Sequence, residues 1–179
     1  PPRRQKLCLY FLAHKNETPN LNTQEDLRKA FIKCAAAETF LSWNYYKKTN
    51  SNNLNEKLRE GTIPSEFLRS MFYTFGDYRD FLFGTDISKL NKHTKALKDN
   101  IDRIFNDIGK TPNGHERQKF WENYGEDIWH GMLCALEKAA GKTGALTNKD
   151  TYTYSTVKFS GDKTTTLEEF AKRPQFFRW

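Results

Sequence analysis

Apolar residues recur every three or four positions through most of this sequence, and that spacing constrains the fold more than any other feature. It places the apolar side chains on one face of an α-helix, so each such segment must bury that face against a neighbour. The clearest cases are residues 65–83 and 115–141, whose apolar positions are largely aromatic. The sequence therefore predicts an all-α fold in which several long helices pack antiparallel.

Capping residues and glycines mark where these helices begin and end. Thr23 and Asp26 have the spacing of a capping box, so the first long helix is expected to begin there and to end near Lys48. Its apolar stripe, expected to face the core, comprises Leu27, Ala30, Phe31, Cys34, Ala37, Leu41 and Tyr45. The other expected helices cover residues 54–60, 65–83, about 97–109, about 115–141, 166–172 and a segment that begins at Pro174.

Residues 142–165 have a different character. Tyr152, Tyr154 and Thr156 alternate with polar residues, and Gly161 interrupts the pattern. Alternation of this kind is typical of strands, so a loop with a short irregular or β-hairpin arm is expected here. The whole sequence is expected to form one domain, a bundle of several long antiparallel helices that carries this arm.

Lys and Arg outnumber Asp and Glu by 29 to 22, which gives a formal net charge of +7. This charge favours acidic partners such as nucleic acid, sulfated glycans or anionic membranes. Nucleic-acid binding is not expected, because the aromatic residues that could stack on bases fall on the predicted core stripes. No apolar run approaches the ~20 residues that a membrane span requires, so membrane insertion is not expected either. Any targeting signal or anchor is expected outside this sequence.

Motifs for catalysis and for metal or cofactor binding fail on their spacing. Two segments resemble a phosphate-binding loop, but Ile104 and Leu136 occupy the positions of the first glycine that such a loop requires. A zinc-protease pattern begins at His115, yet Lys119 stands where the second histidine is needed. No catalytic, metal-binding or cofactor-binding residue is therefore predicted, and the sequence indicates a protein that is not an enzyme.

The three cysteines, Cys8, Cys34 and Cys134, form an odd set without CxxC spacing, which excludes a zinc ribbon and a thioredoxin-type motif. Two alternatives remain open from the residues alone. All three can be reduced thiols in a cytosolic protein, or two can form a disulfide and leave one free thiol.

Five blocks of this sequence resemble Duffy-binding-like domains, in the same order. They are residues 1–8 (PPRRQKLC), 31–39 (FIKCAAAET), 72–80 (FYTFGDYRD), 127–136 (DIWHGMLCAL) and 170–179 (FAKRPQFFRW). The resemblance covers essentially the whole sequence. It is most similar to the domains of the erythrocyte membrane protein 1 family of the malaria parasite, and residues 81–89 (FLFGTDISK) look most like the beta class of that family.

The resemblance implies a Duffy-binding-like helical bundle that adheres to host receptors without catalysis. Members of the family are variant surface antigens on the extracellular face of the infected erythrocyte, where they mediate cytoadherence and contribute to virulence. The partner implied is an endothelial receptor of the immunoglobulin superfamily, and many beta-class members bind intercellular adhesion molecule 1. No cofactor is implied.

The resemblance also implies a division of the sequence. Residues 1–141 are expected to form the central helical subdomain, and residues 142–179 a connecting arm and the start of the last subdomain. Because the main receptor contacts of the beta class are expected C-terminal to this sequence, no receptor-contact residue is assigned. A sulfated glycosaminoglycan, heparan or chondroitin sulfate, is the alternative partner. The basic residues that could contact it are Arg3, Arg4, Lys6, Lys172 and Arg173.

The extracellular setting that the resemblance implies favours a disulfide. Cys34 and Cys134 lie on the apolar stripes of two predicted helices, among small residues that would let the backbones approach within the roughly 7 Å that a disulfide requires. Cys34 with Cys134 is therefore the expected pair, and Cys8 with Cys134 is the competing one. Cys8 is otherwise expected to stay unpaired or to bond outside this sequence.

Overall fold

A computed structural model describes residues 7–50, 53–86, 91–106 and 114–178. These residues form an all-α fold, which confirms the fold class that the apolar spacing predicted. The longer elements are α2 (Gln24–Thr49), α4 (Ser65–Phe83), α5 (Lys92–Ile104) and α6 (Gly114–Ala140). The shorter ones are α1 (Tyr10–Ala13), η2 (Thr18–Asn20), α3 (Leu54–Arg59), η3 (Asp150–Tyr152), α7 (Leu167–Lys172) and α8 (Gln175–Arg178).

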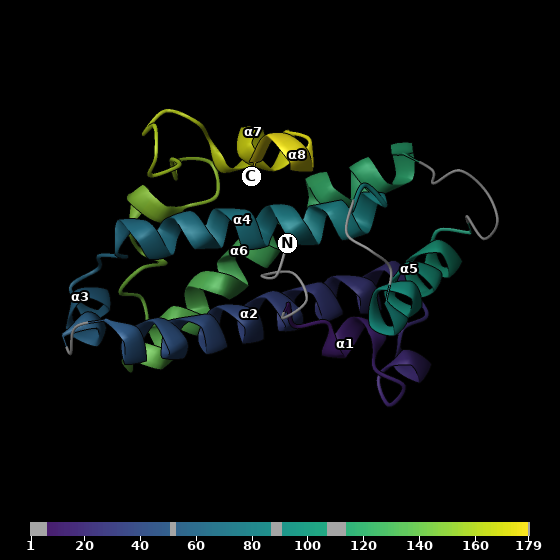
Figure 1. The fold of residues 1–179 in the computed structure, drawn as a ribbon, viewed down its shortest axis with the longest axis horizontal. Helices are drawn as coiled ribbons and strands as arrows, with labels where there is room; N and C mark the ends of the chain where they lie inside the picture. Colours follow the sequence, from purple (N-terminus) through teal and green to yellow (C-terminus); the bar gives the residue numbers. More distant parts are fainter. Residues whose placement is uncertain (1–6, 51–52, 87–90, 107–113, 179) are drawn as a thin grey trace.

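The helices α2, α4 and α6 form the body of the molecule (Figure 1). α4 runs antiparallel to α2, and α6 packs against both of them. α1 packs on α2 and α5 at the end of the molecule where α2 begins, and α3 packs on α6 at the other end. α7 and α8 cover the side of α4 that faces away from α2 (Figure 1).

The ends of most helices are fixed by the residues that the sequence indicated. The Thr23 hydroxyl accepts a hydrogen bond from the backbone N–H of Asp26, and the Asp26 carboxylate accepts one from the N–H of Thr23, so the capping box is confirmed. Gly84 ends α4 in the left-handed conformation, at a φ of 69° that a residue with a side chain rarely adopts. A second predicted capping box opens α7 at Thr166 and Glu169.

The expected bounds of α5 are wrong at both ends. The helix begins at Lys92, because the side chain of Asn91 accepts hydrogen bonds from the N–H groups of His93 and Thr94. It ends at Ile104, before the predicted stop at Gly109, and Asn106 adopts a φ of 56°. A left-handed residue cannot continue an α-helix, so the apolar spacing ran past the true end.

The aromatic residues of α4 and α6 form the centre of the core, as their helical spacing predicted. Phe72 and Phe75 are fully buried and both pack edge-to-face on Trp129, with ring centroids 5.8 and 6.0 Å away. Aromatic pairs in this geometry stabilise beyond the area that they bury. Phe170 of α7 packs on Phe72 from the other side, at 5.5 Å, so the C-terminal segment shares the same core.

The predicted arm at residues 142–165 is a loop held down by hydrogen bonds. Within the described residues, its backbone pairing is a single bridge between Lys158 and Thr166, and Tyr152 belongs to η3, so the alternation there does not form a strand. The Trp129 indole N–H donates to the Tyr152 carbonyl at 2.8 Å, which fixes the middle of the loop to α6.

The buried carboxylate of Glu137 holds the first part of this loop. It accepts hydrogen bonds from the N–H groups of Gly144, Leu146 and Thr147, at 2.7 to 3.0 Å. Burial alone would raise the pKa of Glu137, but these hydrogen bonds outweigh that effect and hold the pKa below its ordinary value. Glu137 therefore has a structural task, and the arm is ordered by it.

Candidate functional site

The buried positions of α2 wind around the helix. Besides Ala30 and Cys34, they follow steps of four residues: Leu27, Phe31, Ala35, Thr39 and Trp43. Each such step advances about 40° beyond a full turn, so the buried line rotates by roughly 160° over these four steps. Residues near the end of α2 that lie on the same side of the helix as Leu27 therefore no longer face the core.

Leu41 and Tyr45 are the apolar residues that leave the core. They were expected to be buried, which is wrong: their side chains are 60% and 71% exposed. The buried line has by then turned toward Trp43, whose indole N–H donates to Asn55 at 3.0 Å. Leu41 and Tyr45 thus form an exposed apolar ridge on α2, and single-sequence periodicity could not reveal it because their spacing is still helical.

A groove between α2 and α6 lies on one side of this ridge, with a volume of about 720 Å³. Its apolar lining from α2 includes Ile32 and Phe40, with Leu41 of the ridge at its edge. The two helices approach closely there, because a Cβ atom added at Gly131 would lie 2.9 Å from Cγ2 of Ile32. Its rim is polar and charged, and includes Arg28, Asp127, His130 and Lys138.

A second groove, of about 510 Å³, lies on the other side of the ridge, between α2 and α4. Leu41 lines both grooves, and Tyr45, Tyr46 and Phe67 line this one. The ridge flanked by two grooves has the composition of a protein-binding patch, in which exposed aromatic and aliphatic side chains lie inside a polar rim.

The cysteines are not paired as predicted. The thiol of Cys34 is buried and lies against Cys8, and all three cysteines are free in this structure. The backbone of Cys8 is held in place, because its N–H donates to the Glu38 carboxylate and its carbonyl accepts from the Tyr78 hydroxyl, each at 2.8 Å. The hydrogen bond from Cys34 lowers the pKa of Cys8 to about 6.

Cys134 is exposed and lines the groove between α2 and α6. It was expected to face Cys34 because both residues lie on helices that pack closely. The helices do approach, but Ile32 and Ala36 face α6 at that point, whereas Cys34 faces the segment that carries Cys8. The position of Cys34 around its helix, which the apolar spacing alone did not resolve, directs its side chain toward Cys8 in this structure.

The basic residues expected to contact a glycan are placed only in part. Arg3, Arg4 and Lys6 lie outside the described residues. Lys172 pairs with Glu168 at 2.7 Å, and Arg173 donates to the Thr165 hydroxyl at 3.0 Å.

Within the described ranges, no three His, Cys, Asp or Glu side chains are placed to hold a metal ion. None of the helices there has the length and apolar composition that a membrane crossing needs. The charged residues that are deeply buried serve the fold, as Arg117 does when it donates to Asp102 at 2.9 Å and to the carbonyl of Leu82.

The chain is thus a helical body with an exposed apolar ridge between two grooves, and comparison with known proteins identifies its class. The family model described as "Duffy binding domain" matches residues 1–178 of the chain. The chain therefore belongs to the Duffy binding domain family, which confirms that part of the resemblance.

Among individual proteins, the chain is similar to the Duffy receptor of Plasmodium vivax (strain Salvador I). The two are 25% identical over 141 residues, which cover 77% of this chain and 12% of that protein. The chain thus corresponds to a small part of the length of the curated relative that it matches.

Proposed function

We propose that this chain is a non-enzymatic adhesion module that binds a protein receptor on a host cell. Its family supports a recognition function, and the matched relative is itself named the Duffy receptor. The observation that carries the proposal is the exposed ridge of Leu41 and Tyr45 between two grooves. At protein interfaces, a few aromatic and aliphatic side chains that pack into pockets of the partner supply most of the affinity.

The finer assignment rests on the sequence blocks that look like the erythrocyte membrane protein 1 family and its beta class. We infer from them that the module is a variant surface antigen of the infected erythrocyte and acts in cytoadherence. The receptor proposed first is intercellular adhesion molecule 1, followed by other endothelial receptors of the immunoglobulin superfamily.

A pair of matched double variants tests the ridge. Leu41→Ser with Tyr45→Ser removes two exposed apolar side chains from the ridge, and Phe176→Ser with Phe177→Ser removes two from α8. Both pairs are largely exposed, so thermal melting should change little for either. In surface plasmon resonance with soluble receptor ectodomains, the ridge variant should lose about tenfold or more in affinity. The proposal fails if the α8 variant loses as much, or if neither variant changes the affinity.

A second candidate function, binding of a sulfated glycosaminoglycan, is favoured by the net charge of +7. Long-range attraction of a polyanion depends on that charge and is screened by salt, whereas an apolar protein interface is much less sensitive to salt. The proposed contact residues include Arg3, Arg4 and Lys6 near the N-terminus, together with Lys172 and Arg173.

A further inference from the structure

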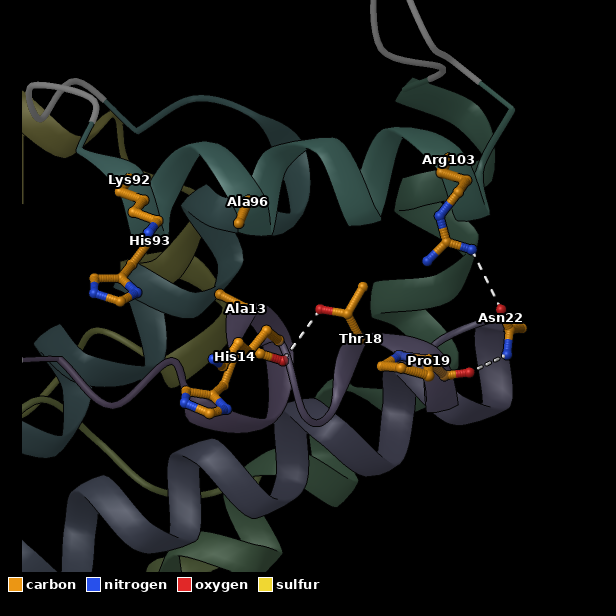
Figure 2. Close-up of a pocket in the computed structure, with 10 residues that line it drawn as sticks. Ala13, His14, Thr18, Pro19, Asn22, Lys92, His93, Ala96 and Arg103 are labelled. Atoms are coloured by element: carbon orange, nitrogen blue, oxygen red, sulfur yellow. Dashed lines mark hydrogen bonds between the residues drawn. The ribbon is translucent and has the colours of Figure 1, made fainter.

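A cavity of about 750 Å³ lies between α5 and the N-terminal elements α1 and η2 (Figure 2). This volume is within the range of pockets that take small ligands. The cavity is remote from the far end of α2, since that helix begins beside it and then extends over 26 residues, or roughly 39 Å.

The lining of this cavity is basic. Lys15, Lys92 and Arg103 contribute cations, and His14 and His93 contribute two imidazoles. No carboxylate occurs among the described residues that line it. A concave surface with one sign of charge concentrates ligands of the opposite sign.

Some cations close to the cavity in sequence have acidic partners, whereas those that line it have none among the described residues. Lys98 of α5 pairs with Asp102, and Arg28 of α2 pairs with Asp127 at 2.8 Å. Among the described residues, Lys15, Lys92 and Arg103 form no ion pair. Within the part of the chain that the structure describes, an external anion would therefore meet cations without an acidic partner.

Several of these donors are held in place by the fold. Arg103 donates to the carbonyl of Leu21 at 2.6 Å and to Oδ1 of Asn22 at 3.4 Å, which fixes its guanidinium (Figure 2). A guanidinium has five N–H groups, so a ligand can still accept from it. The ring of His14 stacks on Tyr10 with centroids 4.5 Å apart, and its Nδ1 accepts from the N–H of Asn16. The neutral ring then carries its proton on Nε2, which makes that atom a donor.

The N-terminus of α5 is not the source of this basic character. The N–H groups of His93 and Thr94 already donate to the side chain of Asn91. The side chains of Lys92 and His93, rather than the helix terminus, are what the cavity offers at that end.

The donors lie at two ends of the cavity. Figure 2 shows Lys92, His93 and His14 at one end and Arg103 at the other. Along α5, Lys92 and Arg103 are separated by roughly 16 Å. A single ligand that contacts both must therefore be an extended molecule with anionic groups along its length. Short or apolar side chains, Ala96 and Pro19, lie between the two ends.

We propose that this cavity binds a sulfated oligosaccharide, with sulfate groups at the two basic ends and sugar rings against the apolar middle. The inference rests on the second candidate function and gives it a site. Guanidinium and ammonium groups form short, charge-assisted hydrogen bonds with such oxyanions. It adds this cavity to the contact residues proposed above, of which Lys172 and Arg173 also have partners in the fold.

The test compares two variants of equal charge. Lys15→Gln with Lys92→Gln removes two cations from the cavity, and Lys47→Gln with Lys48→Gln removes two from the far end of α2. Binding of a heparin-derived hexasaccharide and of its fully desulfated form is measured by calorimetry at several salt concentrations. The cavity variant should lose about tenfold or more in affinity, and the control should lose only about twofold.

The salt dependence separates a contact from an effect on folding. Each lysine that binds a sulfate releases a counterion, so the slope of log affinity against log salt should fall by about one per lysine in the cavity variant and stay the same in the control. The site assignment is overturned if the two variants lose equally while the native chain binds. The glycan function itself is overturned if the native chain does not bind, or binds the desulfated form equally well. Tighter binding of a sulfotyrosine peptide would assign the cavity to an acidic peptide instead.

Discussion

The thiols of Cys8 and Cys34 touch, and their chemistry differs because their surroundings differ. The hydrogen bond from Cys34 lowers the pKa of the half-buried Cys8, which favours its nucleophilic thiolate form. The hydrogen bond to Cys8 and burial both raise the pKa of Cys34. A thiolate in contact with a second thiol is the arrangement from which a disulfide forms when an oxidant is present.

We therefore expect Cys8 and Cys34 to be bridged when the chain is made in an oxidising compartment. Peptide mapping without reduction should recover this pair linked and Cys134 alkylated. A Cys134→Ser variant should keep the link, and a Cys8→Ser variant should show two free thiols. The bridge should stabilise the fold by about 3–4 kcal/mol in the chain-entropy model. Recovery of Cys34 linked to Cys134 would contradict the contact seen here.

At the scale of helices, the close packing of α2 on α6 depends on Gly131. A Cβ atom there would lie 2.9 Å from Cγ2 of Ile32, a β-branched side chain that has little freedom to move. Gly131→Ala should lower stability by about 1 kcal/mol, because an overpacking cost of ~1–3 kcal/mol exceeds the ~1 kcal/mol that alanine gains over glycine within a helix.

A double-mutant cycle measured by chemical denaturation checks this prediction. In an Ile32→Ala background the obstructing methyl group is gone, so Gly131→Ala should raise stability by about 1 kcal/mol there. An increase of the same size in the native background would mean that α2 and α6 are not in close contact at this point.

The elements show how much of the molecule the sequence could predict. Local signals placed the start of α2 at Thr23 and the end of α4 at Gly84, because caps and glycines act through neighbouring residues. The start of α5 was missed, although the capping box at Asn91 was available as a signal. The candidate surface was not predicted: the exposure of Leu41 and Tyr45 depends on which helices cover α2, which is a tertiary property.

At the scale of the whole molecule, the C-terminal segment joins the same core as the long helices. Phe170 packs on Phe72, and Arg178 of α8 is fully buried with its guanidinium on the carboxylate of Asp80. If residues 1–141 and residues 142–179 folded independently, two unfolding transitions would be expected. The core that the two segments share predicts a single transition, because unfolding of one segment would leave a cavity in the core of the other.

The ion pair of Arg178 with Asp80 allows the prediction of a single unfolding transition to be tested. Arg178→Met removes one partner and leaves the carboxylate of Asp80 buried, which should cost about 3–5 kcal/mol. In a two-state molecule that loss lowers the melting temperature of the entire fold, so far-UV circular dichroism and tryptophan fluorescence, to which the buried Trp43 and Trp121 contribute, should shift together. Asp80→Asn combined with Arg178→Met should recover part of the loss, because the uncompensated charge is then absent. A fluorescence transition that stays at its native temperature in the Arg178→Met variant would instead show that residues 142–179 unfold on their own.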